Sequence, residues 1–143
     1  MANKGENTMR IADMPEFQNR TQVVTCTPDD TVYDAVVAMT FKHCGAVAIT
    51  ENEKLIGVFT ERDLLARVVG QGKDVETVKI SDVMTRNVET ATMQDSALLC
   101  MGRMDHGRYR HMPVVDDNDK LVGMLSQRDF IAFTMRELKE KVK

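Results

Sequence analysis

Two segments of this sequence match each other position by position. Lys54-Leu-Ile-Gly-Val-Phe-Thr-Glu-Arg-Asp-Leu64 is matched, 66 residues further along, by Lys120-Leu-Val-Gly-Met-Leu-Ser-Gln-Arg-Asp-Phe130. Only Glu61 against Gln127 changes charge. An internal repeat constrains architecture more than any single motif, because each copy must fold as the same small unit. The chain is therefore predicted to contain two copies of one unit, each closing with an apolar strand, a glycine, a hydroxyl residue and an Arg-Asp pair.

The similarity extends upstream of these segments. The stretch Thr25–Val32 aligns with Thr90–Ala97 at an offset of 65 residues. The apolar stretches Ala46–Ile49 and Met112–Val115 align by sequence at an offset of 66. This change of offset predicts one inserted residue between helix and strand in the second copy.

Each unit is expected to fold as strand, helix, strand, strand, helix. In the first unit, Thr31 and Asp34 have the spacing of a helix-capping box. The apolar residues that follow recur at helical spacing. Two apolar runs then suit a short hairpin, and Thr60 opens a second helix. The expected elements are strands at 23–25, 46–50 and 55–60 and a helix at 61–69, then in the second unit a helix near 96–106, strands near 111–115 and 121–125, and a helix from 127 to about 141.

The polar stretches between and outside these elements divide the chain. A polar connector beginning at Gly70 leads to Ile80-Ser-Asp-Val83, and Ile11-Ala-Asp-Met14 is a faint echo of that lead-in. We therefore predict an N-terminal extension at 1–20, a first unit at 21–70, a connector and lead-in at 71–85, a second unit at 86–137 and a charged C-terminal tail at 138–143.

Composition excludes several classes of protein. Of the 143 residues, 43% are hydrophobic and 29% are charged, which is typical of a globular protein. The net charge of −3 provides no global field for nucleic acid. No apolar run approaches the roughly 20 residues of a membrane span, and the start lacks the apolar stretch of a signal peptide. The three cysteines have no CxxC spacing, which favours free thiols in a reducing, cytoplasmic location.

Several motifs, found together and in order, carry a resemblance to a known family. They are Thr27-Pro-Asp-Asp-Thr31, Ile80-Ser-Asp-Val-Met-Thr85, His111-Met-Pro-Val-Val-Asp116, and the two Gly-x-x-[Thr/Ser]-x-Arg-Asp closures at 57–63 and 123–129. With these motifs in this order, the chain resembles a tandem pair of CBS domains (cystathionine β-synthase-type domains, or a Bateman module). The resemblance implies an α/β (α+β) fold in which two β-α-β-β-α repeats pack as a pseudo-twofold pair. It also implies two clefts that commonly bind adenosine nucleotides, and frequent dimerisation.

The closing motif of each copy admits two interpretations. Its hydroxyl and its carboxylate can simply cap the second helix, because they lie three residues apart. Alternatively, the carboxylate can accept hydrogen bonds from ribose hydroxyls, while the positive end of the helix attracts phosphates. Capping does not explain why arginine precedes aspartate in both copies. The candidate ligand residues of the two motifs are Thr60, Arg62, Asp63, Ser126, Arg128 and Asp129.

A second group of candidates follows the first helix of the second copy. Arg108, Arg110 and His111 are either a solvated helix end or a set of phosphate contacts, for which arginine offers planar, bidentate donors. Through the resemblance, Met112 and Pro113 join this candidate site. The first copy has only Lys42 and His43 at this place, so the two clefts are expected to differ.

No catalytic motif accompanies these residues. The chain has no Gly-x-Ser-x-Gly, no P-loop, no GxGxxG and no histidine at metal-ligand spacing. We therefore predict a noncatalytic, stand-alone regulatory module without an obligatory cofactor. It would sense AMP, ADP, ATP or NADH, form a homodimer and signal in trans to an unidentified protein target, with no nucleic-acid or membrane partner. The alternative is a dimerisation or docking scaffold whose ligand sites are weak or vestigial.

Overall fold

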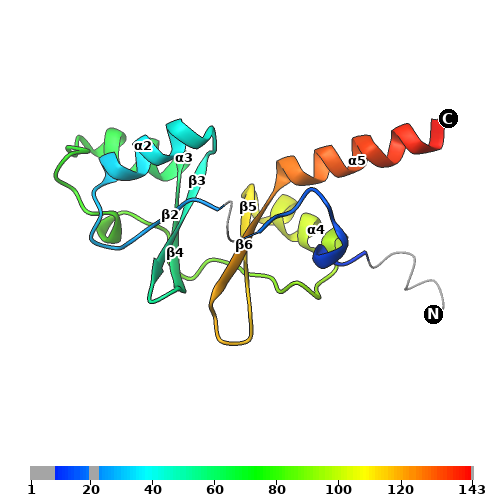
Figure 1. The fold of residues 1–143 in the computed structure, drawn as a ribbon. Helices are drawn as coiled ribbons and strands as arrows, with labels where there is room; N and C mark the ends of the chain where they lie inside the picture. The colour runs from blue at the N-terminus through cyan, green and yellow to red at the C-terminus, as the bar shows by residue number, and fades with distance from the viewer. Residues whose placement is uncertain (1–8, 20–22, 143) are drawn as a thin grey trace.

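Two small sheets form the centre of the molecule. The computed structural model describes residues 9–19 and 23–142 of the chain. The strand orders are β2-β3-β4 in one sheet and β1-β6-β5 in the other. The main helices of each unit lie on the outer side of its own sheet (Figure 1). The predicted mixed α/β class, with two repeats packed as a pair, is confirmed.

The first unit has the predicted order of elements. Its elements are β2 (Thr25–Cys26), α2 (Val32–Lys42), β3 (Ala46–Glu51), β4 (Lys54–Thr60) and α3 (Glu61–Asp63), followed by a π-helical turn at Leu64–Val68 and a 3-10 turn at Val69–Gln71. β2 is parallel to β3, and β3 is antiparallel to β4. The predicted capping box starts α2, because the Thr31 side chain accepts from the Asp34 amide at 3.2 Å. Where the sequence predicted one helix at 61–69, the structure has α3 and these two turns, which are three short helical segments in succession.

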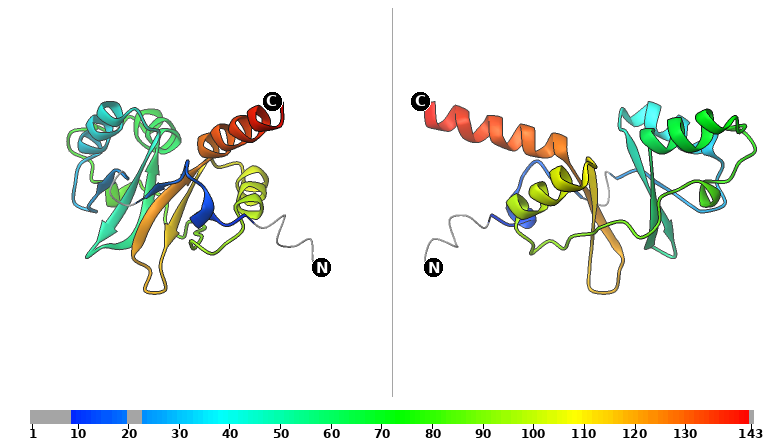
Figure 2. Two further views of the ribbon diagram at one scale, coloured as in Figure 1. Left: turned by 45° about the vertical axis from the view of Figure 1, so that its right-hand side comes forward. Right: turned by 180° about the vertical axis from the view of Figure 1, so that it is seen from behind.

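The second unit differs in how its sheet is completed. Its elements are α4 (Ala97–Gly107), β5 (His111–Val115), β6 (Leu121–Ser126) and α5 (Gln127–Val142). Where the first unit has β2, the second has a single parallel bridge between Ala91 and Val114. Its third strand is β1 (Gln18–Asn19), which pairs antiparallel with β6 and which the sequence did not predict. Beyond the sheet, α5 projects away from the body (Figure 2).

Each lead-in segment packs on the unit that it does not precede. The Ile11 amide donates to the Asp95 carbonyl of the second unit at 3.0 Å. The Ile80 amide donates to the Asp30 carbonyl of the first unit at 2.9 Å. Both isoleucines are fully buried. The predicted domain boundaries stay a prediction, and residues 1–8 of the predicted N-terminal extension lie outside the described residues.

The predicted insertion between helix and strand is wrong. Ala46 pairs with Thr60 in the first hairpin, and His111 pairs with Ser126 in the second. Corresponding residues of the two hairpins are therefore 65 positions apart in the first strands and 66 positions apart in the second strands. The extra residue lies in the turn, which spans 116–120 in the second copy and 51–54 in the first. Sequence similarity among apolar residues misled the alignment, because valine, isoleucine and alanine can shift by one position without changing the pattern.

Small and medium apolar side chains hold the two units together. One buried cluster lies between the sheets and contains Ala46, Ala48, Val58, Leu121 and Met124. Two other clusters lie beneath the helices, one in each unit. The two hairpin turns also join, because the Leu55 amide donates to the Asp119 carbonyl at 3.2 Å and the Leu121 amide to the Glu53 carbonyl at 3.1 Å.

This contact between the sheets leads to a testable prediction about the free energy of unfolding. Ala48 is fully buried between the sheets. We expect Ala48→Leu to lower the free energy of unfolding by about 1–3 kcal/mol, because added methylenes overpack a filled interface. Urea unfolding followed by circular dichroism measures the change. Ala66→Leu, at an exposed helical position, is the matched control. Equal stability of the two variants would contradict this packing.

Candidate functional site

One large cleft opens between the two units. It has a volume of about 1260 Å³ and lies between the end of α2 and start of β3 in the first unit and the end of β6 and start of α5 in the second. Its apolar wall is formed by Val23, Val24, Val36, Met39, Met124 and Ile131. Its polar wall is formed by Glu16, Lys42, His43, Glu61, Arg110, His111, Ser126, Arg128 and Asp129.

Asp129 and Ser126 start α5 at the edge of this cleft. The Ser126 amide donates to Asp129 Oδ2 at 2.9 Å, and the Asp129 amide donates to Ser126 Oγ at 3.1 Å. The predicted capping box is confirmed. Among the described residues, none donates a hydrogen bond to Asp129 Oδ1. The pKa of Asp129 is raised above its ordinary value, mainly because burial disfavours the charged carboxylate. The bonds from Ser126 oppose this shift, and the negative charge of Glu16 adds to it. The carboxylate is thus half-buried and has an acceptor oxygen to spare.

Glu16 is a cleft residue that the sequence did not indicate. Arg136 of α5 donates from Nε to Glu16 Oε2 at 2.6 Å and from Nη2 to Oε1 at 3.4 Å. This pairing holds the pKa of Glu16 below its ordinary value. Arg136 also lies over the Phe133 ring, 5.3 Å from its centroid. The pair spans 120 residues of sequence, and no local pattern connects its two members.

Basic residues from both copies meet in the same cleft. Lys42 and His43 come from the first unit, and Arg110 and His111 come from the second. Arg110 Nη2 lies 4.0 Å from Glu61 Oε1, but both side chains are mostly exposed, so the pair contributes little. Burial lowers the pKa of His111, with Arg110 acting in the same direction and Glu61 opposing it. The imidazole is therefore held toward its neutral form.

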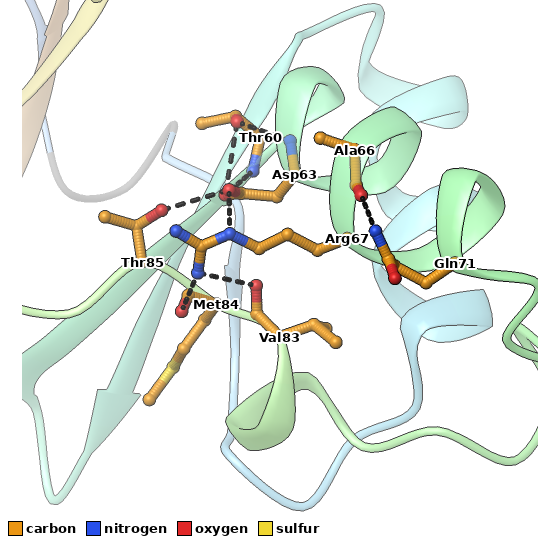
Figure 3. Close-up of polar contacts among 8 residues, drawn as sticks. All are labelled: Thr60, Asp63, Ala66, Arg67, Gln71, Val83, Met84 and Thr85. Atoms are coloured by element: carbon orange, nitrogen blue, oxygen red, sulfur yellow. Dashed lines mark hydrogen bonds and ion pairs between the residues drawn. The ribbon is translucent and has the colours of Figure 1, made fainter.

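Asp63, the counterpart of Asp129, has a different environment. Its Oδ2 accepts from the Thr60 amide at 3.0 Å and from the Thr60 hydroxyl at 3.2 Å. Its Oδ1 accepts from the Thr85 hydroxyl at 3.0 Å and lies 3.6 Å from Arg67 Nε (Figure 3). The residue is only 6% exposed. Neither Thr60 nor Asp63 lines the large cleft.

The other predicted ligand residues also lie outside the cleft lining. Arg62 is exposed on α3, and Arg108 is exposed at the left-handed C-cap of α4, with φ of 60°. Met112 and Pro113 are buried within β5. The structure therefore gathers five predicted residues, Ser126, Arg128, Asp129, Arg110 and His111, in one cleft. Their roles in binding stay a prediction.

The cleft offers no activated nucleophile at its cysteine. Cys44 lines the cleft, but burial raises the pKa of its thiol, which disfavours the nucleophilic thiolate. In the part of the chain that the structure describes, no group of three histidine, cysteine or acidic side chains is placed to hold a metal ion.

A family comparison accords with this architecture. The model of the CBS domain matches residues 15–70 and again residues 80–136. The chain belongs to the CBS-domain family. The two matches correspond to the two units, so the protein contains a tandem CBS pair, as the sequence motifs indicated.

Individual relatives give the same result. The mitochondrial CBS domain-containing protein CBSX3 of Arabidopsis thaliana is 33% identical over 99% of this chain and 72% of its own length. A crystal structure of a CBS-domain-containing protein from Agrobacterium tumefaciens is 34% identical, with a TM-score of 0.71 over 78% of this chain and 89% of that chain.

Two more distant structures were solved with ligands. A CBS domain protein from Pyrobaculum aerophilum, complexed with AMP, is 23% identical, with a TM-score of 0.74 over 85% of this chain and 89% of that chain. A CBS domain pair in complex with 5′-methylthioadenosine and S-adenosyl-L-methionine is 22% identical, with a TM-score of 0.80 over 91% of this chain and 98% of that chain. At sequence identities this low, the similarity of the two structures to this protein shows a shared fold and no more.

The comparisons leave the cellular location open. Among the described helices, none is both long and apolar enough to cross a membrane. The cytoplasmic location stays a prediction, since the Arabidopsis relative is named as mitochondrial.

The two aspartates should differ in their contribution to stability. We expect Asp63→Asn to lower the free energy of unfolding by about 1.5–3 kcal/mol, because it disrupts a buried, charge-assisted network. We expect Asp129→Asn to cost less than about 1 kcal/mol, because it changes one cap and removes a carboxylate that burial already disfavours. Urea unfolding at pH 7 measures both. A larger loss for Asp129→Asn would contradict the difference in environment.

Proposed function

We propose that this protein is a regulatory module that binds an adenosine nucleotide in the cleft beside Asp129. The observation that carries the proposal is the half-buried carboxylate with an oxygen to spare, at the start of a helix and beside an apolar wall. A ribose has two adjacent hydroxyls, and a carboxylate can accept hydrogen bonds from both. The bonds from Ser126 fix the orientation of the carboxylate, so a ligand would not have to order it.

The remaining parts of a nucleotide also find complementary groups. Arg110, Arg128 and Lys42 bring positive charge to the cleft, and arginine pairs with phosphate through two parallel hydrogen bonds. The positive end of α5 adds to this attraction. The apolar wall, which includes Met39 and Met124, suits a flat purine because methionine adapts its shape.

The ligands of the structural relatives favour the adenosine portion as the shared element. One relative was solved with AMP and another with 5′-methylthioadenosine and S-adenosyl-L-methionine. These ligands differ at the 5′ position and share adenine and ribose. We therefore propose AMP as the first ligand to test, with ADP, ATP and NADH as further candidates for the same cleft.

We expect AMP to bind the parent protein and to bind Asp129→Ala roughly a hundredfold more weakly. The reason is the loss of two charge-assisted hydrogen bonds worth about 1.5 kcal/mol each, together about 3 kcal/mol. Isothermal titration calorimetry measures both affinities. Asp117→Ala, which removes an exposed acid in the hairpin turn, should bind like the parent. Undiminished binding by Asp129→Ala would contradict the ribose role.

The proposed output is noncatalytic. The chain would signal in trans, through a protein target that recognises its ligand-bound state. The alternative role, a dimerisation or docking scaffold, is favoured by the exposed apolar side chains on several helices. Calorimetry separates the two roles, because a scaffold with vestigial sites would bind none of AMP, ADP, ATP and NADH.

We also propose that the protein forms a homodimer through exposed helical faces. On the helices that close the two units, Leu65 and Ile131 are 66% and 57% exposed, whereas Val68 and Phe130 belong to the cores. Helix α2 adds an unpredicted apolar stripe of Tyr33, Val37 and Phe41. A stripe of this kind is costly in water and suits an isologous contact with a second copy.

We expect light scattering at micromolar concentration to give twice the chain mass of 16.1 kDa. The double variant Val37→Glu, Phe41→Glu should shift the protein toward the monomer, because it places charge in the α2 stripe. Glu51→Gln, on an exposed position of the first hairpin, is the control for a surface substitution. A strictly monomeric parent would contradict the dimer.

A further inference from the structure

We infer that each chain binds one nucleotide, at Asp129, because the protein's own Thr85 and Arg67 occupy the equivalent carboxylate, Asp63. This inference rests on the proposed function and specifies which of the two repeated motifs performs it. The sequence motif is the same in both copies. The difference lies in what the rest of the chain places beside each carboxylate.

The two motifs are equivalent in local structure. In the first copy, the Glu61 amide donates to the Gly45 carbonyl at 3.0 Å. In the second, the Gln127 amide donates to the Arg110 carbonyl at 2.9 Å. The capping box is formed in both copies. Local sequence therefore gives no reason for one aspartate to bind a ligand and the other not.

Thr85 takes the place that a ligand hydroxyl would need at Asp63. Its hydroxyl donates to Asp63 Oδ1 at 3.0 Å, and the same oxygen lies 3.6 Å from Arg67 Nε (Figure 3). The other oxygen is shared between the amide and hydroxyl of Thr60. Both carboxylate oxygens are thus in use, and almost no surface of Asp63 reaches solvent.

These partners are held firmly in place by the backbone. The Thr85 amide donates to the Val58 carbonyl at 2.9 Å, and the Val58 amide donates to the Thr85 carbonyl at 3.0 Å. Arg67 is fixed by a second contact, from Nη1 to the Met84 carbonyl at 3.1 Å. The bridge fixes the Thr85 backbone beside Asp63, and a ligand would have to displace both the Thr85 hydroxyl and the Arg67 guanidinium to reach the carboxylate.

The helix after the motif explains why only one copy is closed. Arg67 lies in the π-helical turn Leu64–Val68, whereas α5 continues as a regular helix. A π turn is uncommon and changes the direction of the side chains that it carries. The counterpart of Arg67 in the repeat is Phe133, which packs against the apolar core of the second unit. The second copy therefore provides no cation at this position to pair with Asp129.

Counting bound AMP tests the inference. Equilibrium dialysis with labelled AMP, extended to millimolar ligand, is run on the parent, Asp129→Asn and Asp63→Asn. We expect one AMP per chain for the parent. We expect roughly hundredfold weaker binding for Asp129→Asn, and for Asp63→Asn one AMP per chain with an affinity within about threefold of the parent.

The outcomes separate this inference from the proposed function. Two AMP molecules per parent chain would overturn the inference and leave the function standing. No binding by the parent would overturn the function itself. One site that survives Asp129→Asn would assign the ligand elsewhere and overturn the inference. If Asp63→Asn does not fold, the parent and Asp129→Asn still decide the result.

Discussion

The burial of two sheet faces against each other is the constraint on which the rest of this structure depends. The helices of each unit cover one face of its three-stranded sheet, and the other face of the sheet is apolar. Small side chains such as Ala46 and Ala48 let the second sheet approach closely. That approach places the α5 start of one unit beside the α2–β3 corner of the other, which creates the cleft. Neither unit alone forms this cleft.

The duplicated motif shows how one piece of sequence acquires two roles. A hydroxyl residue and an aspartate three residues later can form a helix cap, and both copies do so. Capping satisfies one carboxylate oxygen and leaves the other open. At Asp63 the chain fills that capacity with Thr85 and Arg67, which stabilises the fold. At Asp129 that capacity is left over, and we propose that a ligand uses it.

The local features of the fold were predictable from the sequence. The repeat, the Thr31–Asp34 cap and the capping role of both closing motifs depend on residues a few positions apart. The hairpin register was not predictable, because a run of small and branched apolar residues matches its neighbour almost as well after a shift of one position.

Long-range partners were not predictable either. Glu16 joins the cleft and pairs with Arg136, 120 residues away, and the strand that follows Glu16 is too short to leave a periodic pattern. The contact of Asp63 with Thr85 likewise depends on a lead-in segment that packs on the preceding unit. A motif seen twice therefore predicts two similar sites, although tertiary contacts leave only one of them open.

The central claim is that the open carboxylate of Asp129 receives the ribose of an adenosine nucleotide. A crystal structure of the protein grown with AMP tests it most directly. The account expects one AMP per chain, with both ribose hydroxyls within hydrogen-bond distance of Asp129, the adenine against the apolar wall and the phosphate toward Arg110 or Arg128. An AMP bound at Asp63, or a ribose that does not contact Asp129, would contradict it.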